Sequence, residues 1–475
     1  MNKTDYLIIG AGPTGLGAAT RLMEKGLDFQ LLEATGHFGG LASSFVDDAG
    51  FTWDMGGHVQ FSHYDTFDRY MDLALGKEGW YEHQRESWVW IKERFVPYPF
   101  QNNLHRLDPG DRWACVKGLL EAWQRSVAKQ DDSSIENQKS KIENFEDWML
   151  ATFGPGITEL FMYPYNFKVW AYPPPMMDYY WIGERVSVPS LGGVLKSICM
   201  DRDEVSWGPN KVFRFPKEGG TGAVWKAVGG MVPKGRIQLK CGVTHIDVAR
   251  KEVHTDTGDN IAYRHLVSTI PLNHLIRIAP GVVSPHTADA LKYSATNVVG
   301  VGLDGQTPEH LKTKCWMYFP DGNSPYYRVT VFTNYSPQNA PKPGGQWSLM
   351  TETSESPMKP VQQDGLVEET LLALEEDGLI PDRNAICSVV HKRLDQGYPT
   401  PFLGRDAVVD PILRSFEAQS IFSRGRFGAW KYEVANQDHS FAQGYECVER
   451  LAAGGGDEYE PTLFRPNWVN GRRNP

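Results

Sequence analysis

The sequence predicts an α/β fold, built on a Rossmann-type dinucleotide-binding domain to which a helical insertion domain and an antiparallel β-sheet domain are added. The first observation is local. An apolar run at Asp5–Gly10 stops at glycine, helical spacing follows at Gly15–Lys25, and a second apolar run occupies Phe29–Leu32. Strand, glycine turn, helix and strand in this order make half of a parallel sheet. The second observation is that helical and strand-like regions follow as separate blocks.

The helical block lies between Leu107 and Arg185 and includes the patterns Asp111–Arg125 and Phe145–Phe153. A polar connector, Lys129–Lys141, separates these two patterns. Its side chains offer too little apolar surface to pack, so we expect a mobile loop there. Strand-like runs return beyond residue 210 between Gly, Pro and Asp turns, at Ile237–Cys241, Val243–Val248, Leu266–Ile270, Val298–Leu303 and Tyr327–Phe332.

The length of 475 residues exceeds the size at which one hydrophobic core usually stops growing, so we expect several domains. The dinucleotide-binding domain is expected to comprise residues 1–80, 212–280 and 416–475. A helical substrate-binding domain with mobile flaps is expected at residues 104–204. The antiparallel sheet domain is expected to comprise residues 81–103 and 281–415.

Composition narrows the possible partners. The formal net charge of −10 disfavours binding to nucleic acid or to anionic lipid, and an anionic substrate needs a local cluster of arginines. Six dispersed cysteines without a C-x-x-C pair give no reason to expect a metal site. The N-terminus lacks the pattern of a signal peptide, and no apolar run is long enough to cross a membrane. We therefore expect a cytoplasmic protein, and the subunit number stays open.

The glycine turn has the pattern G-x-G-x-x-G, formed by Gly10, Gly12 and Gly15 and followed about 20 residues later by Glu33. The first glycine makes the turn, the second lets backbone amides approach a pyrophosphate, and the third lets helix and strand pack closely. The helix N-terminus adds a positive dipole end. Glu33 is expected to accept hydrogen bonds from the ribose hydroxyls of a bound dinucleotide.

A second glycine cluster, Gly39–Ser44, follows Glu33 almost at once. The resulting pattern, E-x(5)-G-G-L-A, resembles the FAD-binding segment shared by flavin amine oxidases, phytoene desaturases and UDP-galactopyranose mutases. The resemblance favours FAD over NAD as the cofactor. It implies contacts to FAD from Gly40, Leu41 and Ser43.

The next segment, Gly50–His63, resembles the flavin-side loop of UDP-galactopyranose mutases, particularly the branch found in eukaryotes. Two glycines before His58 allow the backbone to change conformation and to place an imidazole against the flavin. The resemblance continues over most of the chain, through Tyr81–Arg85, Val96–Asn103, Phe161–Trp170, Gly183–Val186, Trp207–Asn210, Arg214–Pro216, Gly219–Gly222, Cys315–Pro320, Pro325–Arg328, Gly397–Pro401 and Ser423–Ser440.

The resemblance also implies the roles of individual residues. Further cofactor contacts are implied for Gly57, His58, Val243, Arg426, Asn436, Gln437, Asp438 and Ser440. Recognition of uracil and ribose is implied for Tyr98, Phe100, Gln101, Asn166 and Trp170, and neutralisation of the diphosphate for Arg185 and Arg328 with Tyr318, Tyr398 and Tyr432. The remaining substrate contacts are Phe61, Arg85, Asn210, Trp316, Arg426 and Asn436. Asp438 or Ser440 can alternatively serve as a simple helix N-cap.

The implied activity is the interconversion of UDP-galactopyranose and UDP-galactofuranose, in which N5 of reduced FAD attacks the anomeric carbon and NADPH or NADH is the external reductant. His58, Arg185 and Arg328 are the implied catalytic residues, with His58 supporting the reduced flavin rather than acting as an acid or base. The sequence shows no catalytic triad or paired carboxylates, and a cofactor-driven reaction needs none. Two alternatives remain: an FAD-dependent oxidoreductase of the amine-oxidase type, and a mutase for a different nucleotide sugar.

Overall fold

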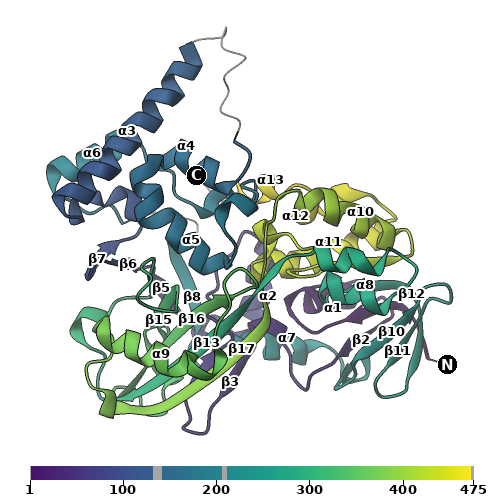
Figure 1. The fold of residues 1–475 in the computed structure, drawn as a ribbon. Coiled ribbons are helices and arrows are strands. Elements are labelled where there is room, and N and C mark those ends of the chain that lie inside the picture. The colour runs from purple at the N-terminus through teal and green to yellow at the C-terminus, as the bar shows by residue number, and fades with distance from the viewer. Residues whose placement is uncertain (1, 132–141, 206–210, 472–475) are drawn as a thin grey trace.

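The computed structural model describes residues 2–131, 142–205 and 211–471, in which two large sheets are surrounded by helices (Figure 1). The first sheet has the order β10-β11-β12-β1-β2-β9, and β18 pairs with β12. Its strands are β1 (Asn2–Ile9), β2 (Phe29–Glu33), β9 (Ile237–Leu239), β10 (Val243–Asp247), β11 (Glu252–Thr255), β12 (Asn260–Ser268) and β18 (Ile421–Ser423). The strands β12, β1, β2 and β9 run parallel, as β18 does beside β12, which confirms the predicted Rossmann-type sheet.

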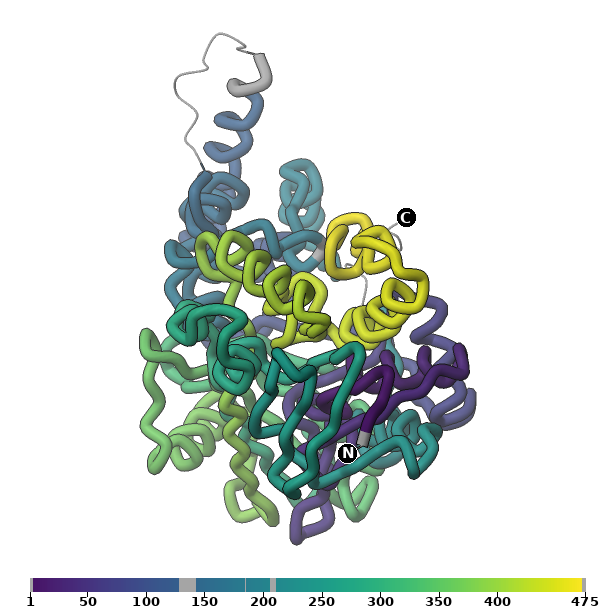
Figure 2. The backbone as a smooth tube through the Cα atoms, turned by 90° about the vertical axis from the view of Figure 1, so that its right-hand side faces the viewer, coloured from purple at the N-terminus to yellow at the C-terminus, as the bar shows by residue number. Residues whose placement is uncertain are grey.

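Helix α1 (Pro13–Glu24) connects β1 to β2 and packs against α11 (Gln437–Ala453) near the end of the chain. Glycines permit this close contact, because a Cβ on Gly444 would lie 1.9 Å from the Thr14 carbonyl oxygen. Figure 2 shows the C-terminal helices against the N-terminal part of the chain. The other helices near this sheet and the C-terminus are α2 (Asp65–Leu75), α7 (Gly222–Met231), α8 (Leu272–Ile278), α10 (Arg405–Glu417), α12 (Pro461–Phe464) and α13 (Pro466–Asn470).

The second sheet has the order β17-β13-β16-β15-β14-β6-β7. Its strands are β6 (Ser87–Ile91), β7 (Arg94–Pro97), β13 (Tyr293–Asp304), β14 (Trp316–Tyr318), β15 (Arg328–Val331), β16 (Gln346–Glu355) and β17 (Ile386–Pro399). Neighbouring strands are antiparallel, as predicted, except for β6 and β14, which are parallel. Helix α9 (Gln363–Glu376) packs its apolar side against this sheet. Two short ribbons, β3 (Ser44–Val46) with β4 (Thr52–Asp54) and β5 (Trp80–Gln84) with β8 (Val212–Pro216), complete the strands.

The helical segment contains α3 (Pro109–Asp131), α4 (Phe145–Ile157), α5 (Tyr163–Trp170) and α6 (Leu191–Met200), and α3 projects from the body of the molecule (Figure 1). Helix α3 is longer than the predicted Asp111–Arg125, so it includes the first residues of the predicted connector. Most of that connector, residues 132–141, lies outside the described residues.

The predicted strands exist, but several bounds differ from the prediction. The strand predicted at Leu266–Ile270 is β12, which begins at Asn260 and ends at Ser268. The first half of this strand contains polar residues, so the apolar pattern in the sequence indicated only its buried end. The division into three domains stays a proposal. No helix within the described ranges is both long enough and apolar enough to cross a membrane.

Candidate functional site

A cavity of about 1060 Å³ is lined by residues from both large sheets and from the helical segment. At one end lie the glycine turn after β1 and the end of β2; at the other lie aromatic and arginine side chains. The cavity therefore joins the predicted cofactor-binding and substrate-binding residues.

The glycine turn has the geometry expected of a pyrophosphate-binding loop. Gly10 has a φ of +98°, and a Cβ on it would lie 2.3 Å from the Thr269 Oγ1. A Cβ on Gly15 would lie 1.8 Å from the Gly10 carbonyl oxygen, so helix and strand could not pack as they do. Gly12 is the N-cap of α1 and supplies no side-chain cap. The N-terminus of α1 is thus left for an anionic ligand.

Glu33, at the end of β2, borders the same part of the cavity. Its carboxylate accepts a hydrogen bond of 2.7 Å from the Ala11 backbone N–H and one of 2.8 Å from the Thr35 backbone N–H. These bonds fix the orientation of the carboxylate. The Thr35 hydroxyl donates to the same carboxylate at 2.8 Å, so of its about four acceptor positions one is left for a ribose hydroxyl.

The loop 55–61 carries His58 into the cavity. Gly56 has a φ of +126°, which favours glycine, and the Gly57 N–H donates to Glu352 Oε1 at 2.7 Å. Burial lowers the pKa of His58 to about 4, although the nearby Glu352 opposes this shift. The imidazole is therefore neutral at pH 7. Its Nδ1 is buried and has no hydrogen-bond partner among the described residues.

The lowered pKa of His58 makes stability depend on pH in a defined window. Its ordinary pKa of 6.5 applies to the unfolded chain, so the contribution of His58 is fully present above about pH 6.5 and is lost as the pH falls toward 4. We expect wild type to lose more unfolding free energy than His58→Gln when urea unfolding is measured at pH 7, 6 and 5. Replacement of the exposed His37 by Gln is the control. An equal pH response of wild type and His58→Gln would contradict the assignment.

Arg328 and Glu352 form an ion pair between the neighbouring strands β15 and β16. The Glu352 side chain is buried, and the Arg328 side chain is partly exposed. Arg328 Nη2 lies 2.7 Å from both carboxylate oxygens of Glu352, and the Tyr327 hydroxyl donates to Oε2 at 2.5 Å. Burial alone would raise the pKa of Glu352, but Arg328, Tyr327 and the Gly57 N–H lower it below its usual value. Glu352 thus links the arginine to the loop that carries His58.

Arg185 and Arg426 also line the cavity. Arg185 Nη2 donates to the Glu433 carbonyl oxygen at 2.6 Å, and Arg426 donates to the carbonyl oxygens of Gly397 and Ala435. Within the described parts of the chain, neither guanidinium is paired with a carboxylate. Arg185 Nη1 is buried without a partner there. Two uncompensated positive charges at one cavity wall favour an anionic ligand.

Aromatic side chains form the remaining wall. Arg85 lies over the rings of Tyr98 and Trp316, and its Nη2 donates to the Tyr318 hydroxyl at 3.3 Å. The Trp170 ring meets Tyr398 and Tyr432 edge to face, at centroid distances of 5.8 and 4.7 Å. The Tyr phenols and ring faces at this wall can contact a diphosphate and a flat base.

Two amides at the same wall have fixed orientations. Gln101 donates through Nε2 to the Ser187 carbonyl oxygen at 2.5 Å, and Asn166 donates through Nδ2 to the Met162 carbonyl oxygen at 2.7 Å. Gln101 Oε1 is buried and has no partner among the residues described. It is an acceptor that an N–H group of a bound base could satisfy.

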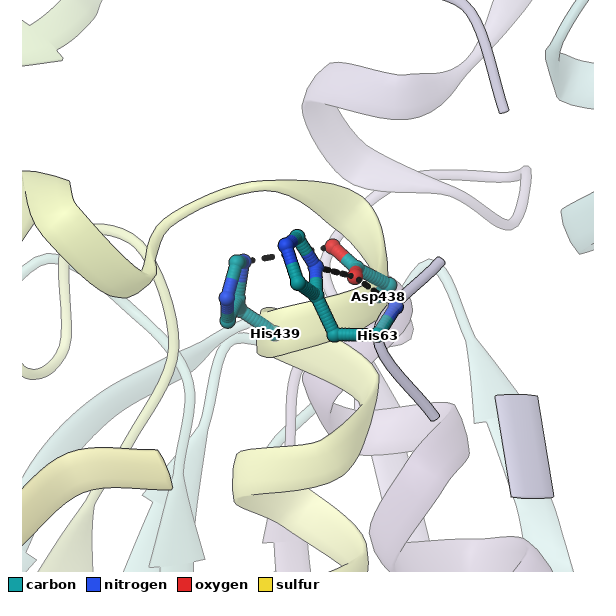
Figure 3. A group of neighbouring side chains, drawn as sticks. All are labelled: His63, Asp438 and His439. Carbon is teal, nitrogen blue, oxygen red and sulfur yellow. Dashed lines mark hydrogen bonds and ion pairs between the residues drawn. The ribbon is translucent and has the colours of Figure 1, made fainter. Parts of the chain in front are cut away.

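The first turn of α11 contributes Asn436, Gln437 and Ser440 to the cavity. Asn436 is the N-cap, so the alternative in which Asp438 or Ser440 caps this helix is wrong. Asp438 instead accepts from the His63 backbone N–H at 3.0 Å and from His63 Nδ1 at 2.7 Å. Its other oxygen lies 3.2 Å from His439 Nδ1, and Figure 3 shows the three side chains gathered at the start of the helix.

The cluster of His63, Asp438 and His439 has ligand atoms within 4.8 Å of one another, which raises the question of a metal ion. Two ligands of one tetrahedral zinc ion lie about 3.3 Å apart. His63 Nδ1 and Asp438 Oδ2 are closer, at hydrogen-bond distance. Burial raises the pKa of Asp438, but His439 and His63 outweigh it and lower that pKa below its usual range. Hydrogen bonds and ion pairing account for the cluster.

Most of the predicted site residues line the cavity: Gly10, Gly12, Glu33, Gly40, Leu41, Gly57, His58, Phe61, Arg85, Tyr98, Gln101, Asn166, Trp170, Arg185, Trp316, Tyr318, Arg328, Tyr398, Arg426, Tyr432, Asn436, Gln437 and Ser440. Five others do not: Gly15, Ser43, Phe100, Val243 and Asp438. Gly15, Phe100 and Asp438 lie behind the wall, where Phe100 packs on Phe161 and Asp438 holds His63. The predicted Asn210 lies outside the described residues. The roles of all these residues stay predictions.

The sequence interpretation missed several residues that line the cavity, chiefly Glu352, Tyr165, Tyr327 and Trp181. Glu352 could have been noticed in the sequence, because it is a carboxylate within the buried strand Gln346–Glu355. A buried carboxylate needs a partner. The partner, Arg328, could not be identified without the pairing of β15 with β16.

Comparisons with known proteins agree with this geometry. The model of the family described as flavin containing amine oxidoreductase matches residues 13–408. A crystal structure of reduced UDP-galactopyranose mutase is 43% identical, with a TM-score of 0.92, and the match covers 98% of this chain and 99% of that chain. A putative protoporphyrinogen oxidase from Exiguobacterium sp. 255-15 is 16% identical over 95% of this chain and 99% of its own, and its TM-score of 0.70 shows the fold alone.

Among curated proteins the similarity is short. The zeta-carotene desaturase of Zea mays is 39% identical over 69 residues, which are 14% of this chain and 12% of that protein. The matching part of the chain thus spans about an eighth of the length of this relative.

Proposed function

Because the chain belongs to the family of flavin containing amine oxidoreductases, and within it to the UDP-galactopyranose mutases, we propose that it uses FAD to interconvert UDP-galactopyranose and UDP-galactofuranose. The observation that carries the proposal is the pair of guanidiniums, Arg185 and Arg426, which line the cavity without a carboxylate partner among the described residues. An amine substrate would be cationic and would be repelled there. A nucleoside diphosphate sugar supplies the missing negative charge.

The residues at the other end of the cavity fit FAD. Gly12 leaves the N-terminus of α1 without a side-chain cap, and Glu33 can accept from ribose. These groups suit the pyrophosphate and ribose of the cofactor. Gly40, Leu41, Gly57 and the first turn of α11 would hold the rest. When bound and reduced, FAD supplies the nucleophile, its N5, for the anomeric carbon of the sugar.

The protein orients the substrate and stabilises its charge. Arg328 has a pKa well above its usual value, because Glu352 outweighs the effect of burial, so it stays charged throughout the accessible pH range. Arg328 and Arg185 can stabilise the negative charge that develops on the diphosphate when the anomeric bond breaks. The phenols of Tyr318, Tyr398 and Tyr432 add donors. Tyr98, Gln101 and Asn166 are proposed to recognise the uridine.

His58 is proposed to support the reduced flavin and not to act as a general acid. Its neutral imidazole has one N–H donor and one acceptor, and a pKa of about 4 leaves it without a proton to release near pH 7.

Three further features belong to the same proposal. Ring interconversion leaves the number of electrons on the flavin unchanged, so the reductant, NADPH or NADH, is needed only to activate the enzyme. A cytoplasmic location agrees with six free cysteines. The acidic net charge disfavours nucleic acid as a partner.

The deciding experiment uses the purified, yellow protein. We expect the anaerobically reduced enzyme to convert UDP-galactofuranose to UDP-galactopyranose, as followed by chromatography, and the oxidised enzyme to do so far more slowly. A panel of other UDP-hexoses tests the substrate. Peroxide release with an amine, and no ring interconversion in the reduced state, would instead establish an oxidase.

A further inference from the structure

Asn470 lies at the end of α13, close to the C-terminus, yet its side chain is buried and makes two hydrogen bonds. Its Nδ2 donates to the Glu433 carbonyl oxygen at 3.1 Å, and its Oδ1 lies 2.8 Å from His439 Nε2. Because a carbonyl oxygen only accepts, the first bond fixes which way the carboxamide points. His439 Nε2 must then be the donor in the second bond.

The bond to His439 leads toward the proposed cofactor. His439 Nδ1 faces Asp438, and Asp438 holds both the ring and the backbone N–H of His63. His63 lies two residues after the loop 55–61 that carries His58, and Asp438 follows Gln437 of the cavity wall. By accepting from His439 Nε2, Asn470 fixes the orientation of the His439 ring, which places Nδ1 3.2 Å from Asp438 Oδ1.

The bond to Glu433 leads toward the proposed substrate. The carbonyl oxygen that accepts from Asn470 also accepts from Arg185 Nη2 at 2.6 Å. The Glu433 side chain is held separately by the buried Arg405, through bonds of 2.7 and 2.6 Å. The backbone beneath Arg185 is thus fixed from two sides. Helix α13 also contacts the turn Gly183–Arg185 itself.

We propose that Asn470 is a positioning residue that couples the two halves of the site. Through His439 and Asp438 it holds the first turn of α11 and the His63 segment against the cofactor, and through the Glu433 carbonyl it holds the support of Arg185. Only a side chain with both a donor and an acceptor can make this link. The inference rests on the proposed function, since it assigns Arg185 to the UDP moiety.

The test compares three variants in the flavin-loaded enzyme. Asn470→Leu keeps the approximate volume but removes both bonds; His439→Phe keeps the ring and removes only the branch toward the cofactor. Asn467→Ala, on the exposed side of the same helix, is the control. The measurements are the flavin absorbance spectrum and reduction potential, the Kd for UDP, and the kinetics of ring interconversion.

We expect Asn470→Leu to raise the Kd for UDP about tenfold, as the loss of one hydrogen bond does, and also to shift the flavin spectrum and potential. His439→Phe should shift the spectrum and potential but leave the Kd for UDP within about twofold of wild type. Asn467→Ala should change neither. If Asn470→Leu does not fold, Asn470→Ser, which admits a water molecule, takes its place.

Two results would overturn the inference. One is a wild-type spectrum, potential and Kd for UDP in the Asn470 variant. The other is an equal rise in the Kd for UDP in His439→Phe, which would mean general loosening and not two separate branches. Failure of the wild-type enzyme to bind UDP would instead refute the proposed function, and the branch toward the cofactor would then be judged from the flavin measurements alone.

Discussion

Replacement of Arg328 by alanine should lower kcat/KM for UDP-galactofuranose about 10²–10³-fold while FAD remains bound. Arg328 faces the cavity from β15, so its loss removes positive charge from the proposed diphosphate site. Glu352 loses its charged partner, which lowers stability, but it keeps the bond to the Gly57 N–H, and the glycine turn is unchanged, so we expect FAD to remain bound. The flavin absorbance of the purified variant reports the bound cofactor. Chromatography of the reduced variant with substrate reports kcat/KM.

Two further variants sharpen this prediction. Arg328→Lys keeps the charge but loses the planar fork that holds two oxygens, so its activity should lie between wild type and Arg328→Ala. Arg383→Ala removes an exposed arginine paired with Glu368 and should leave turnover unchanged. Wild-type turnover in Arg328→Ala would remove this residue from the site.

Replacement of Glu352 by alanine should damage both stability and activity. The carboxylate accepts from Gly57, Tyr327 and Arg328, and all three donors would be left without it. Removal of one partner of a buried ion pair costs about 3–5 kcal/mol of unfolding free energy. Because the Gly57 bond also fixes the loop that carries His58, we expect the flavin spectrum to shift as well. Urea unfolding and absorbance spectroscopy measure the two effects.

Controls separate the structural and functional parts of that loss. Glu355 lies on β16, as Glu352 does, and forms a more exposed ion pair with Arg393 of β17. Glu355→Ala should therefore cost no more than about 1 kcal/mol of unfolding free energy. The double variant Arg328→Met, Glu352→Leu removes both charges, so it should regain part of the stability but no activity. Equal stability of Glu352→Ala and wild type would contradict the structural role of the pair.

The pH response of Glu352 has a defined sign. Its pKa in the folded protein is lowered, so its contribution to stability is present above its ordinary pKa of 4.5 and is lost as the pH falls below that value. His58 contributes in the same direction in its own window, between pH 6.5 and about 4. A fall in pH therefore reduces the stabilisation that Glu352 provides and the stabilisation that the neutral His58 provides.

Local features were predictable because they depend on neighbouring residues. The glycine turn, α1 and the two strands beside it lie within the first 33 residues, and Gly15 answers a steric demand of the backbone at Gly10. The arginines and aromatics were identified through resemblance, which supplied the set but not its contacts. The interpretation of Asp438 or Ser440 as an N-cap failed because Asp438 has a partner, His63, that is 375 residues away.

The sequence by itself determined the Rossmann-type start, because glycine conformation and helix polarity are properties of short segments. Its resemblance to known families supplied the class of cofactor and the residues from which a uridine diphosphate site could be assembled. Only the tertiary structure decided which charges remain unpaired. Glu352 reaches Gly57 across 295 residues and Arg185 reaches Glu433 across 248. Such contacts follow from how the sheets and helices pack, and packing sums many weak interactions that no single segment reveals.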